Sequence, residues 1–265
     1  MELTEITPEP IRFRPSHQGR NVLVTGAARG IGQAIAQAFV ERGATVGICD
    51  LNPDDVAATC EALNALGHGR AVPVACDVSD YDALVAAVAE TGLEFDTVIN
   101  NAGISPKHDG VAHKVWQMAP EEWRRVVDVN LTGSFNTVRA LAPGMIAARR
   151  GWIVNTSSVA GKTYSPIVAC HYAATKSAII GFTKHLAAEL GPHAIRVNAL
   201  APGRIATPMV AGVAPEVNAE QVKLTPMARL GEPAEVADVA LWLTSTESSF
   251  VTGQTIDVAG GLYMT

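Results

Sequence analysis

Two periodicities alternate along the chain from residue 20 onward. Short runs rich in Val and Ile are apolar at nearly every position, which is typical of parallel strands covered on both faces. The segments between them repeat apolar residues three and four positions apart, as amphipathic helices do. Strands alternating with helices predict a doubly wound parallel α/β sheet with helices on both faces. The predicted strands are NVLVT (21–25), ATVGICD (44–50), AVPVAC (71–76), DTVIN (96–100), WIVNTS (152–157) and IRVNAL (195–200).

This order of elements predicts one domain over residues 20–265, preceded by a proline-bearing arm at 1–19. Asn52 followed by Pro53 predicts a capped helix start just after the second strand. The longest irregular stretches, 103–118 and 202–226, each follow a predicted strand directly. Doubly wound sheets bind ligands at the carboxyl ends of their strands, so we expect a crevice there, with 202–226 as the substrate loop.

The composition limits the kinds of partner that this chain is expected to bind. Only 17% of the residues are charged while 48% are hydrophobic, which predicts that surface is buried between subunits. A net charge of −6, without blocks of like charge, argues against a nucleic-acid or membrane partner. The first residues do not resemble a signal peptide and no run of eighteen apolar residues occurs, so we expect a soluble, cytoplasmic protein.

The four cysteines occur singly in apolar or small-residue surroundings, and we expect them to be buried free thiols. None belongs to a CxxC pair or to a Cys/His cluster at zinc spacing, so the sequence predicts no metal site.

The stretch TGAARGIG (25–32) joins the first predicted strand to the first helix. Gly26, Gly30 and Gly32 allow a sharp turn and a close approach to a pyrophosphate at the helix N-terminus. Glycines at a tight turn also occur without a ligand, so both interpretations stay open.

Asp50 ends the second strand, where its carboxylate can bind a ribose diol and would repel a ribose phosphate. This favours NAD(H) over NADP(H), although Asp50 is also suited to capping a loop. Arg29, within the glycine-rich turn, could still meet a phosphate.

HYAATK (171–176) places Tyr172 and Lys176 four residues apart, on one face of a helix. The ammonium group and an oxidised nicotinamide would together lower the pKa of the phenol and allow proton transfer at neutral pH. Such pairs also occur by chance, but Ser158 lies after another strand and could orient a reacting oxygen. Asn130 lies inside a helical segment, VDVNLTGSF, where asparagine is unfavourable without a specific role.

TGAARGIG, NNAG (100–103), Asn130, Ser158, YAATK and APG (201–203) together resemble the classical short-chain dehydrogenase/reductase family, in its order and over residues 20–262. The resemblance implies a Rossmann-type sheet of about seven strands, a homotetramer and a catalytic tetrad. Tyr172 would be the acid/base, Ser158 would orient the substrate, Lys176 would bind ribose and lower the tyrosine pKa, and Asn130 would hold a water.

The resemblance also extends the cofactor site. Thr207 would meet the nicotinamide carboxamide, and Asp77 would line the adenine pocket. The implied cofactor residues, besides Gly26, Arg29, Gly30, Gly32, Asp50 and the Tyr172–Lys176 pair, are Ile31, Leu51, Asp77, Val78, Asn101, Ala102, Gly103, Pro202, Gly203, Ile205 and Thr207. Two departures from the family pattern are a serine-to-tyrosine gap one residue longer than usual and the ending IDVAGG.

The substrate is less determined. Ser105, His108, Tyr164 and Arg204 join Ser158 as candidate substrate residues, and His171 is predicted to lie on the helix surface. We expect a small polar alcohol, such as a polyol, sugar or hydroxy acid, that NAD oxidises to a ketone.

Two alternatives remain open. One is a reductase of 3-oxoacyl thioesters, in which Arg149 and Arg150 would dock an acidic carrier protein. The other is a non-catalytic NAD-binding sensor, which would have no use for Tyr172.

Overall fold

The computed structural model describes residues 17–211 and 215–264, so most of the predicted arm lies outside the described residues. Seven parallel strands form one sheet in the order β3-β2-β1-β4-β5-β6-β7, which confirms the doubly wound prediction. The strands are β1 (Asn21–Thr25), β2 (Thr45–Asp50), β3 (Arg70–Ala75), β4 (Thr97–Asn100), β5 (Gly151–Thr156), β6 (Ile195–Pro202) and β7 (Thr255–Val258).

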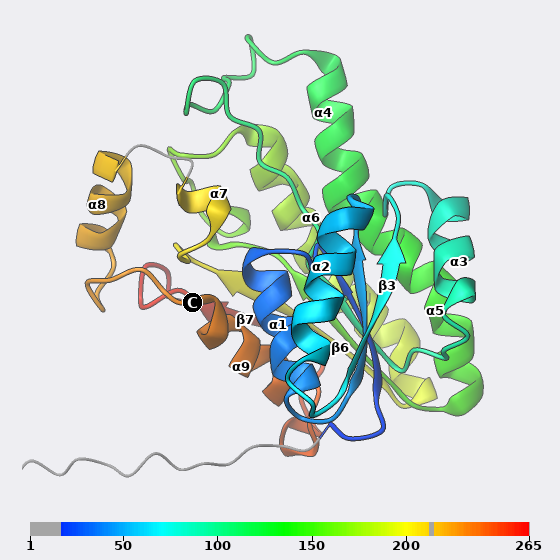
Figure 1. Cartoon of the computed structure of the whole chain (residues 1–265). Helices are drawn as coiled ribbons and strands as arrows, with labels where there is room; N and C mark the ends of the chain where they lie inside the picture. The colour runs from blue at the N-terminus through cyan, green and yellow to red at the C-terminus, as the bar shows by residue number, and fades with distance from the viewer. Residues whose placement is uncertain (1–16, 212–214, 265) are drawn as a thin grey trace, which may run out of the picture.

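Helices cover both faces of the sheet (Figure 1). The helices α1 (Gly30–Val40), α2 (Pro53–Asn64) and α9 (Pro233–Leu243) contribute side chains to one buried apolar cluster. The opposite cluster takes side chains from α3 (Tyr81–Glu90), α5 (Gly133–Ala148) and α6 (Cys170–Leu190). Because β1 to β6 are apolar on both sides, they pack into both layers, as the continuous Val and Ile runs predicted.

The start of α2 confirms the predicted cap. Asn52 accepts a hydrogen bond from the Asp54 amide at 2.9 Å, and Pro53 occupies the first helical position.

The helices α4 (Pro120–Val127) and α5 are joined by a π-helical turn, η1 (Asp128–Thr132). The short 3₁₀ segments are η2 (Val159–Gly161), η3 (Gly191–His193) and η4 (Thr246–Ser248). None of the helices in the described ranges is long and apolar enough to cross a membrane.

Two segments beyond the carboxyl ends of the strands frame the crevice region. The stretch expected to be irregular over 202–226 instead contains α7 (Pro208–Ala211) and α8 (Pro215–Leu224), which Figure 1 shows to one side of the sheet. The other segment, between β4 and α4, is irregular as predicted apart from one bridge between His108 and Val111.

The cysteine prediction holds for three residues and is wrong for one. Cys49, Cys60 and Cys76 are buried, and the sulfur atoms of Cys49 and Cys76 lie 3.6 Å apart on adjoining parts of the sheet. Cys170 is exposed, because it occupies the outer side of the first turn of α6.

Candidate active site

The glycine-rich turn is held in a geometry that only glycine allows. Gly26 and Gly30 have φ angles of +63° and +60°, in the left-handed region. A Cβ on Gly32 would lie 2.1 Å from the Gly26 carbonyl oxygen. Arg29, the exposed residue before α1, supplies no side-chain cap, so the first amides of the helix remain available to an anion.

Asp50 lies at the end of β2 and is hydrogen-bonded to this turn. Its Oδ2 accepts the Ala28 amide at 3.0 Å and its Oδ1 accepts the Leu51 amide at 2.8 Å. The capping interpretation is therefore confirmed. A carboxylate oxygen has more than one acceptor site, so these bonds leave room for ribose hydroxyl groups.

The segment after β4 is tied to the same turn. The Asn101 side chain donates to the carbonyl oxygens of Thr25 and Gly26, at 3.0 and 3.1 Å. In return, the Thr25 hydroxyl accepts the amides of Asn101 and Ala102, each at 3.0 Å. Neighbouring strands β1 and β4 thus present one continuous wall at the point where strand order reverses.

Asn130 lies in the π-helical turn η1, which explains an asparagine inside a helical segment. Its Oδ1 accepts the Ile104 amide at 2.8 Å, while its Nδ2 donates to the Ile104 carbonyl at 3.0 Å and to Thr175 at 3.3 Å. Both amide donors and one acceptor site of the side chain are used, so Asn130 fixes the segment after β4 to helix α6. π-turns commonly mark functional sites.

Lys176 is a buried cation next to Tyr172. Its Nζ donates to the Thr156 carbonyl at 2.7 Å and lies 5.6 Å from the centre of the Tyr172 ring. Burial lowers the pKa of Lys176 to about 8. The neighbouring Ser157 donates to the Lys176 carbonyl at 2.6 Å, so it supports the helix and leaves Ser158 as the serine that faces Tyr172.

The pKa of Tyr172 is raised in the protein alone. Burial raises it, against the lowering effects of a hydrogen bond with Ser158 and the charge of Arg204. The expected lowering involves an oxidised nicotinamide as well as the ammonium group of Lys176, so it stays a prediction for the complex. The phenol stays protonated at neutral pH, which is the form that donates a proton to a carbonyl oxygen.

Arg204 is a cation near the tyrosine, and Lys107 is a second cation near Arg204. Arg204 donates through Nε and Nη2 to the Asn218 side chain of α8, at 3.0 and 2.6 Å. Lys107, which the sequence analysis did not select, donates to the Ile167 carbonyl, and burial together with the charge of Arg204 lowers its pKa.

The other candidate substrate residues differ in how well they are placed to contact a ligand. The Ser105 hydroxyl is buried and has no hydrogen-bond partner among the described residues, so it is available to a ligand. Tyr164 is 82% exposed and encloses nothing by itself.

His108 is directed to Glu122 of α4, with Nε2 2.8 Å from Oε2. His171 contacts the other oxygen of the same carboxylate at 3.0 Å and is 0% exposed, so the prediction of a helix-surface residue is wrong. Its position could have been found from the sequence, because His171 lies four and eight residues before the buried Thr175 and Ile179. Glu122 itself carried no recognisable signal.

The remaining cofactor candidates also gather at the carboxyl edge of the sheet. Asp77 accepts from Ser79 and pairs with Arg125 at 3.0 Å, and these contacts lower its pKa although burial opposes them. Thr207 lies over the glycine-rich turn, with its Cβ 3.6 Å from where a Cβ of Gly30 would stand. The residues Ile31, Val78, Gly103, Pro202, Gly203 and Ile205 are buried or half-buried in the same region, whereas Leu51 is exposed.

Known families, proteins and solved structures are similar to this chain over nearly its whole length. A family described as enoyl-(acyl carrier protein) reductase matches residues 26–263. The 3-oxoacyl-[acyl-carrier-protein] reductase of Vibrio harveyi is 38% identical over 247 residues, covering 93% of this chain and 98% of that protein.

Solved structures agree on the fold. A structure of a 3-oxoacyl-[acyl-carrier protein] reductase from Brucella melitensis has a TM-score of 0.95 and 87% identity, covering 100% of this chain and 99% of that one. A second from the same organism, with bound NAD, has a TM-score of 0.93 and 85% identity, with the same coverage. A gluconate 5-dehydrogenase from Burkholderia cenocepacia, in complex with NADP and tartrate, has a TM-score of 0.87 and 33% identity over 94% of this chain and 97% of that one.

Proposed function

Since the chain belongs to the short-chain dehydrogenase/reductase family and is an oxidoreductase, we propose that it reduces 3-oxoacyl thioesters with a nicotinamide cofactor. The observation that carries the chemistry is the buried ammonium group of Lys176, 5.6 Å from the centre of the Tyr172 ring, with Ser158 at the start of η2, which packs against α6. The relatives named above support the substrate class. This was the alternative reading of the sequence, and it replaces the small polar alcohol as the first candidate.

A bound nicotinamide supplies the hydride that reaches the carbonyl carbon. Ser158 positions the carbonyl oxygen through its hydroxyl, and Tyr172 donates the phenolic proton to that oxygen as the alcohol forms. Lys176 holds its ammonium group beside the phenol, where it stabilises the phenolate left behind. Asn130 keeps the wall after β4 aligned with this helix through Ile104 and Thr175.

The chain's residues fit NAD(H) better than NADP(H). Asp50 places a carboxylate where a ribose diol would donate hydrogen bonds, and its charge would repel a ribose phosphate. Arg29 is exposed and follows Ala28, whose amide Asp50 accepts. Its guanidinium group is the one that a ribose phosphate would contact. The bound NAD in the Brucella melitensis relative agrees with this assignment.

Cofactor choice is tested by direct binding. The intact protein should bind NADH at least about tenfold more tightly than NADPH, and Asp50→Ala should narrow or reverse that ratio. Tighter binding of NADPH by the intact protein would overturn the assignment to NAD.

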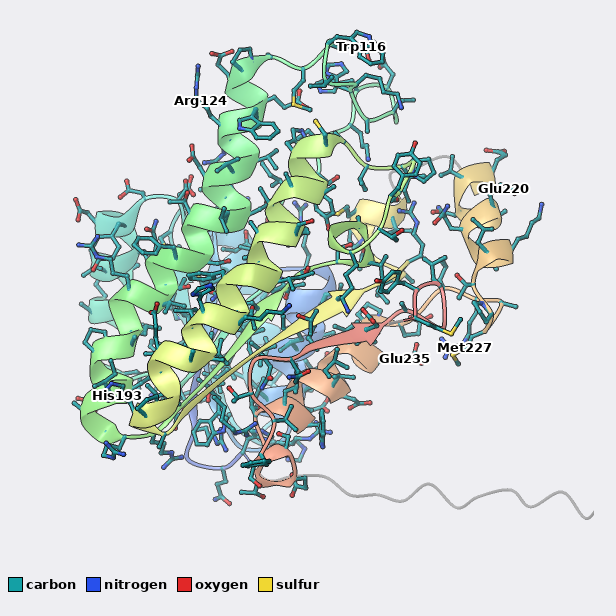
Figure 2. All side chains as sticks on the ribbon, turned by 180° about the vertical axis from the view of Figure 1, so that it is seen from behind. Trp116, Arg124, His193, Glu220, Met227 and Glu235 are labelled. Carbon is teal, nitrogen blue, oxygen red and sulfur yellow. The ribbon has the colours of Figure 1, made fainter. Side chains whose placement is uncertain are left out.

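The two arginines that would dock a carrier protein lie at the end of the molecule away from Tyr172. Arg149 and Arg150 precede β5 and lie near His193, since Arg149 donates to the Pro192 carbonyl at 3.1 Å. Figure 2 shows His193 at the end of the structure opposite Trp116, and α6 alone spans about 30 Å between Tyr172 and that end. A carrier protein docked on these arginines could therefore deliver its thioester only to the crevice of another copy of the chain.

A second candidate substrate has support of its own. Arg204 acts through its charge on the catalytic phenol and also on Lys107, and these two cations suit a carboxylate-bearing hydroxy acid such as a sugar acid. The structural likeness to a gluconate 5-dehydrogenase points the same way. This is the hydroxy-acid part of the expectation drawn from the sequence.

The two candidates are separated by a substrate panel followed through nicotinamide absorbance. We expect acetoacetyl thioesters to be reduced near neutral pH with a higher kcat/KM than sugar acids, tartrate or polyols show in either direction. A higher kcat/KM for a hydroxy acid would reject the thioester assignment.

Tyr172→Phe tests catalysis itself. This variant should lose roughly 10³-fold or more in turnover while still binding NADH. Tyr81→Phe removes a hydroxyl from α3 under Arg139 and serves as the matched control with unchanged turnover. Unaltered turnover in Tyr172→Phe would show that another group is the acid. No turnover in the intact chain, with NADH still bound by both proteins, would instead favour the non-catalytic NAD-binding sensor.

We also propose that the chain assembles as a homotetramer through α5 and α6. Phe135 of α5 is 46% exposed, and α6 exposes the small residues Ala174, Ser177 and Gly181 on one side. A Cβ at Gly181 would meet no atom within 4 Å, so Gly181→Arg leaves the subunit intact while blocking helix-to-helix contact. Sedimentation should show a larger species for the intact chain and a smaller one for the variant; a lone 27.8 kDa species for the intact chain would refute assembly.

A further inference from the structure

The segment between β4 and α4 brings three possible metal ligands together beside the crevice. Nε2 of His108 lies 2.8 Å, and Nδ1 of His113 lies 3.4 Å, from the same oxygen, Oε2 of Glu122. All three donor atoms lie within 4.8 Å of one another. The segment between β4 and α4 and the first turn of α4 lie at the end of the molecule that Figure 2 marks with Trp116 and Arg124.

We propose that His108, His113 and Glu122 bind a late first-row divalent metal ion, with Zn²⁺ the best match. Imidazole nitrogen and carboxylate oxygen are ligands that such ions take. Metal–ligand bonds of about 2.0–2.1 Å place neighbouring ligands of a tetrahedral ion about 3.3 Å apart. The two separations from Glu122 lie on either side of that value, and a fourth position remains for water.

Two features of the histidines are unexplained without an ion. The rings of His108 and His113 are stacked, with centroids 3.4 Å apart and planes within 1°. Rings do not favour this sandwich, and two protonated imidazoles would repel each other. In addition, Nδ1 of His113 is buried and has no hydrogen-bond partner among the described residues.

A shared ion accounts for both features. It attracts two neutral rings to one point and occupies the unused lone pair of His113. The rings must tilt apart slightly on binding, so that both in-plane lone pairs meet the ion.

Glu122 is held in place from its other side. Nε2 of His171 lies 3.0 Å from Oε1 of Glu122, and His171 is fully buried at the start of α6. Carboxylates that bind metals are commonly oriented by such hydrogen bonds. An ion here would join the loop to α4 and, through Glu122, to the helical turn that carries Tyr172. The proposal does not depend on which substrate the enzyme reduces.

The test uses the full chain, free of any histidine tag, stripped with EDTA and titrated with Zn²⁺ alone against a chromogenic chelator. We expect one ion per chain with a Kd on the order of 1 µM or tighter. At 100 times the Kd, Zn²⁺ should raise the Tm by roughly 5–10 °C. Co²⁺ in place of Zn²⁺ should give the visible absorption of a tetrahedral site.

Three variants locate the site. His113→Ala removes a partly exposed ring, and Glu122→Gln retains a hydrogen bond to His171; each should weaken Zn²⁺ binding by about tenfold or more and abolish the Co²⁺ spectrum. His68→Ala removes an exposed histidine outside the cluster and should leave binding unchanged. The absence of saturable binding in the intact chain, or equal binding in all the variants, overturns the proposal.

Discussion

A half-buried arginine lies at the amino ends of the strands and a buried lysine lies at their carboxyl ends, and the two cations are used differently. At the amino edge, Arg196 in β6 donates five hydrogen bonds, to Leu243, Ser245, Val251 and both oxygens of Ser248. At the carboxyl edge, Lys176 donates one hydrogen bond within the described residues, to Thr156. Burial lowers the pKa of each. The saturated cation holds the fold together, whereas the unsaturated one keeps donors free for chemistry.

The carboxyl edge also contains neutral groups whose hydrogen bonds are not satisfied. The hydroxyls of Ser105 and Thr156 are buried and have no hydrogen-bond partner in the described part of the chain. Such groups reduce stability unless a ligand satisfies them. Ser105 and Thr156 therefore give up stability for binding capacity at the carboxyl edge, and the cost can be measured. At the amino edge, Nη1 of Arg20 is also buried without a hydrogen-bond partner among the described residues, but the guanidinium group lies over the Trp152 ring.

The largest effect should follow from Lys176→Met. We expect kcat/KM to fall by about 10²–10⁴-fold, because the phenolate of Tyr172 loses its stabilising charge. The free energy of unfolding should not decrease, since an apolar side chain of similar length replaces a buried charge. Steady-state kinetics and urea unfolding measure the two effects, with the exposed Lys184→Met as control. A large loss of stability with intact turnover would reverse the assignment.

Arg196→Met should show the opposite result. Removing five hydrogen bonds leaves several buried acceptors unsatisfied, so we expect a loss of about 3 kcal/mol in unfolding free energy and a Tm lower by roughly 6–12 °C. The kcat/KM of the folded variant should stay within about twofold of the intact enzyme. Arg70→Met, at the exposed start of β3, is the control. Reduced turnover at unchanged stability would contradict the comparison.

The pH dependence of stability should reveal Lys176. Its folded pKa of about 8 lies below the unfolded value of 10.5, so the unfolded chain binds more protons between these pH values. Stability from this group is fully present above pH 10.5, and is lost as the pH falls through 8, by an amount on the order of 3 kcal/mol. Subtracting the curve of Lys176→Met from that of the intact protein isolates the effect. A flat difference curve would show that the pKa is not lowered.

The smallest effect is expected from Thr156→Val. The hydroxyl has no partner among the described residues, so replacing it with a methyl group should raise the unfolding free energy by up to about 1 kcal/mol. Thermal unfolding measures the change. A loss of more than about 1 kcal/mol would mean that the hydroxyl is already satisfied in solution.

Much of the fold could be predicted because its determinants are local. The apolar runs located six strands to within about two residues, and Asn52 with Pro53 located a helix start. The carboxyl-edge crevice followed from parallel topology, since the ends of β1, β4 and β5 must meet at one edge. The spacing of Tyr172 and Lys176 fixed their shared face in the same way.

What could not be predicted depends on contacts between distant segments. His171 is buried because Glu122 of α4 covers it, and no spacing rule links those two residues. The pKa of Tyr172 is raised by burial, and this rise is opposed by Ser158 and Arg204, which lie 14 residues before it and 32 residues after it. Local rules also missed α7 and α8, whose short polar sequences have weak helical periodicity.

The π-turn at Asn130 makes the path from α4 to α5 sensitive to length rather than to composition. A π-turn accommodates one surplus residue, so removing a single residue would restore regular α-helix and redirect the side chains inside the turn while the flanking helices keep their facing. Asn130, which lies inside the turn, would then lose Ile104. Among descendants of this chain, point substitutions should accumulate along the segment while insertions and deletions are eliminated.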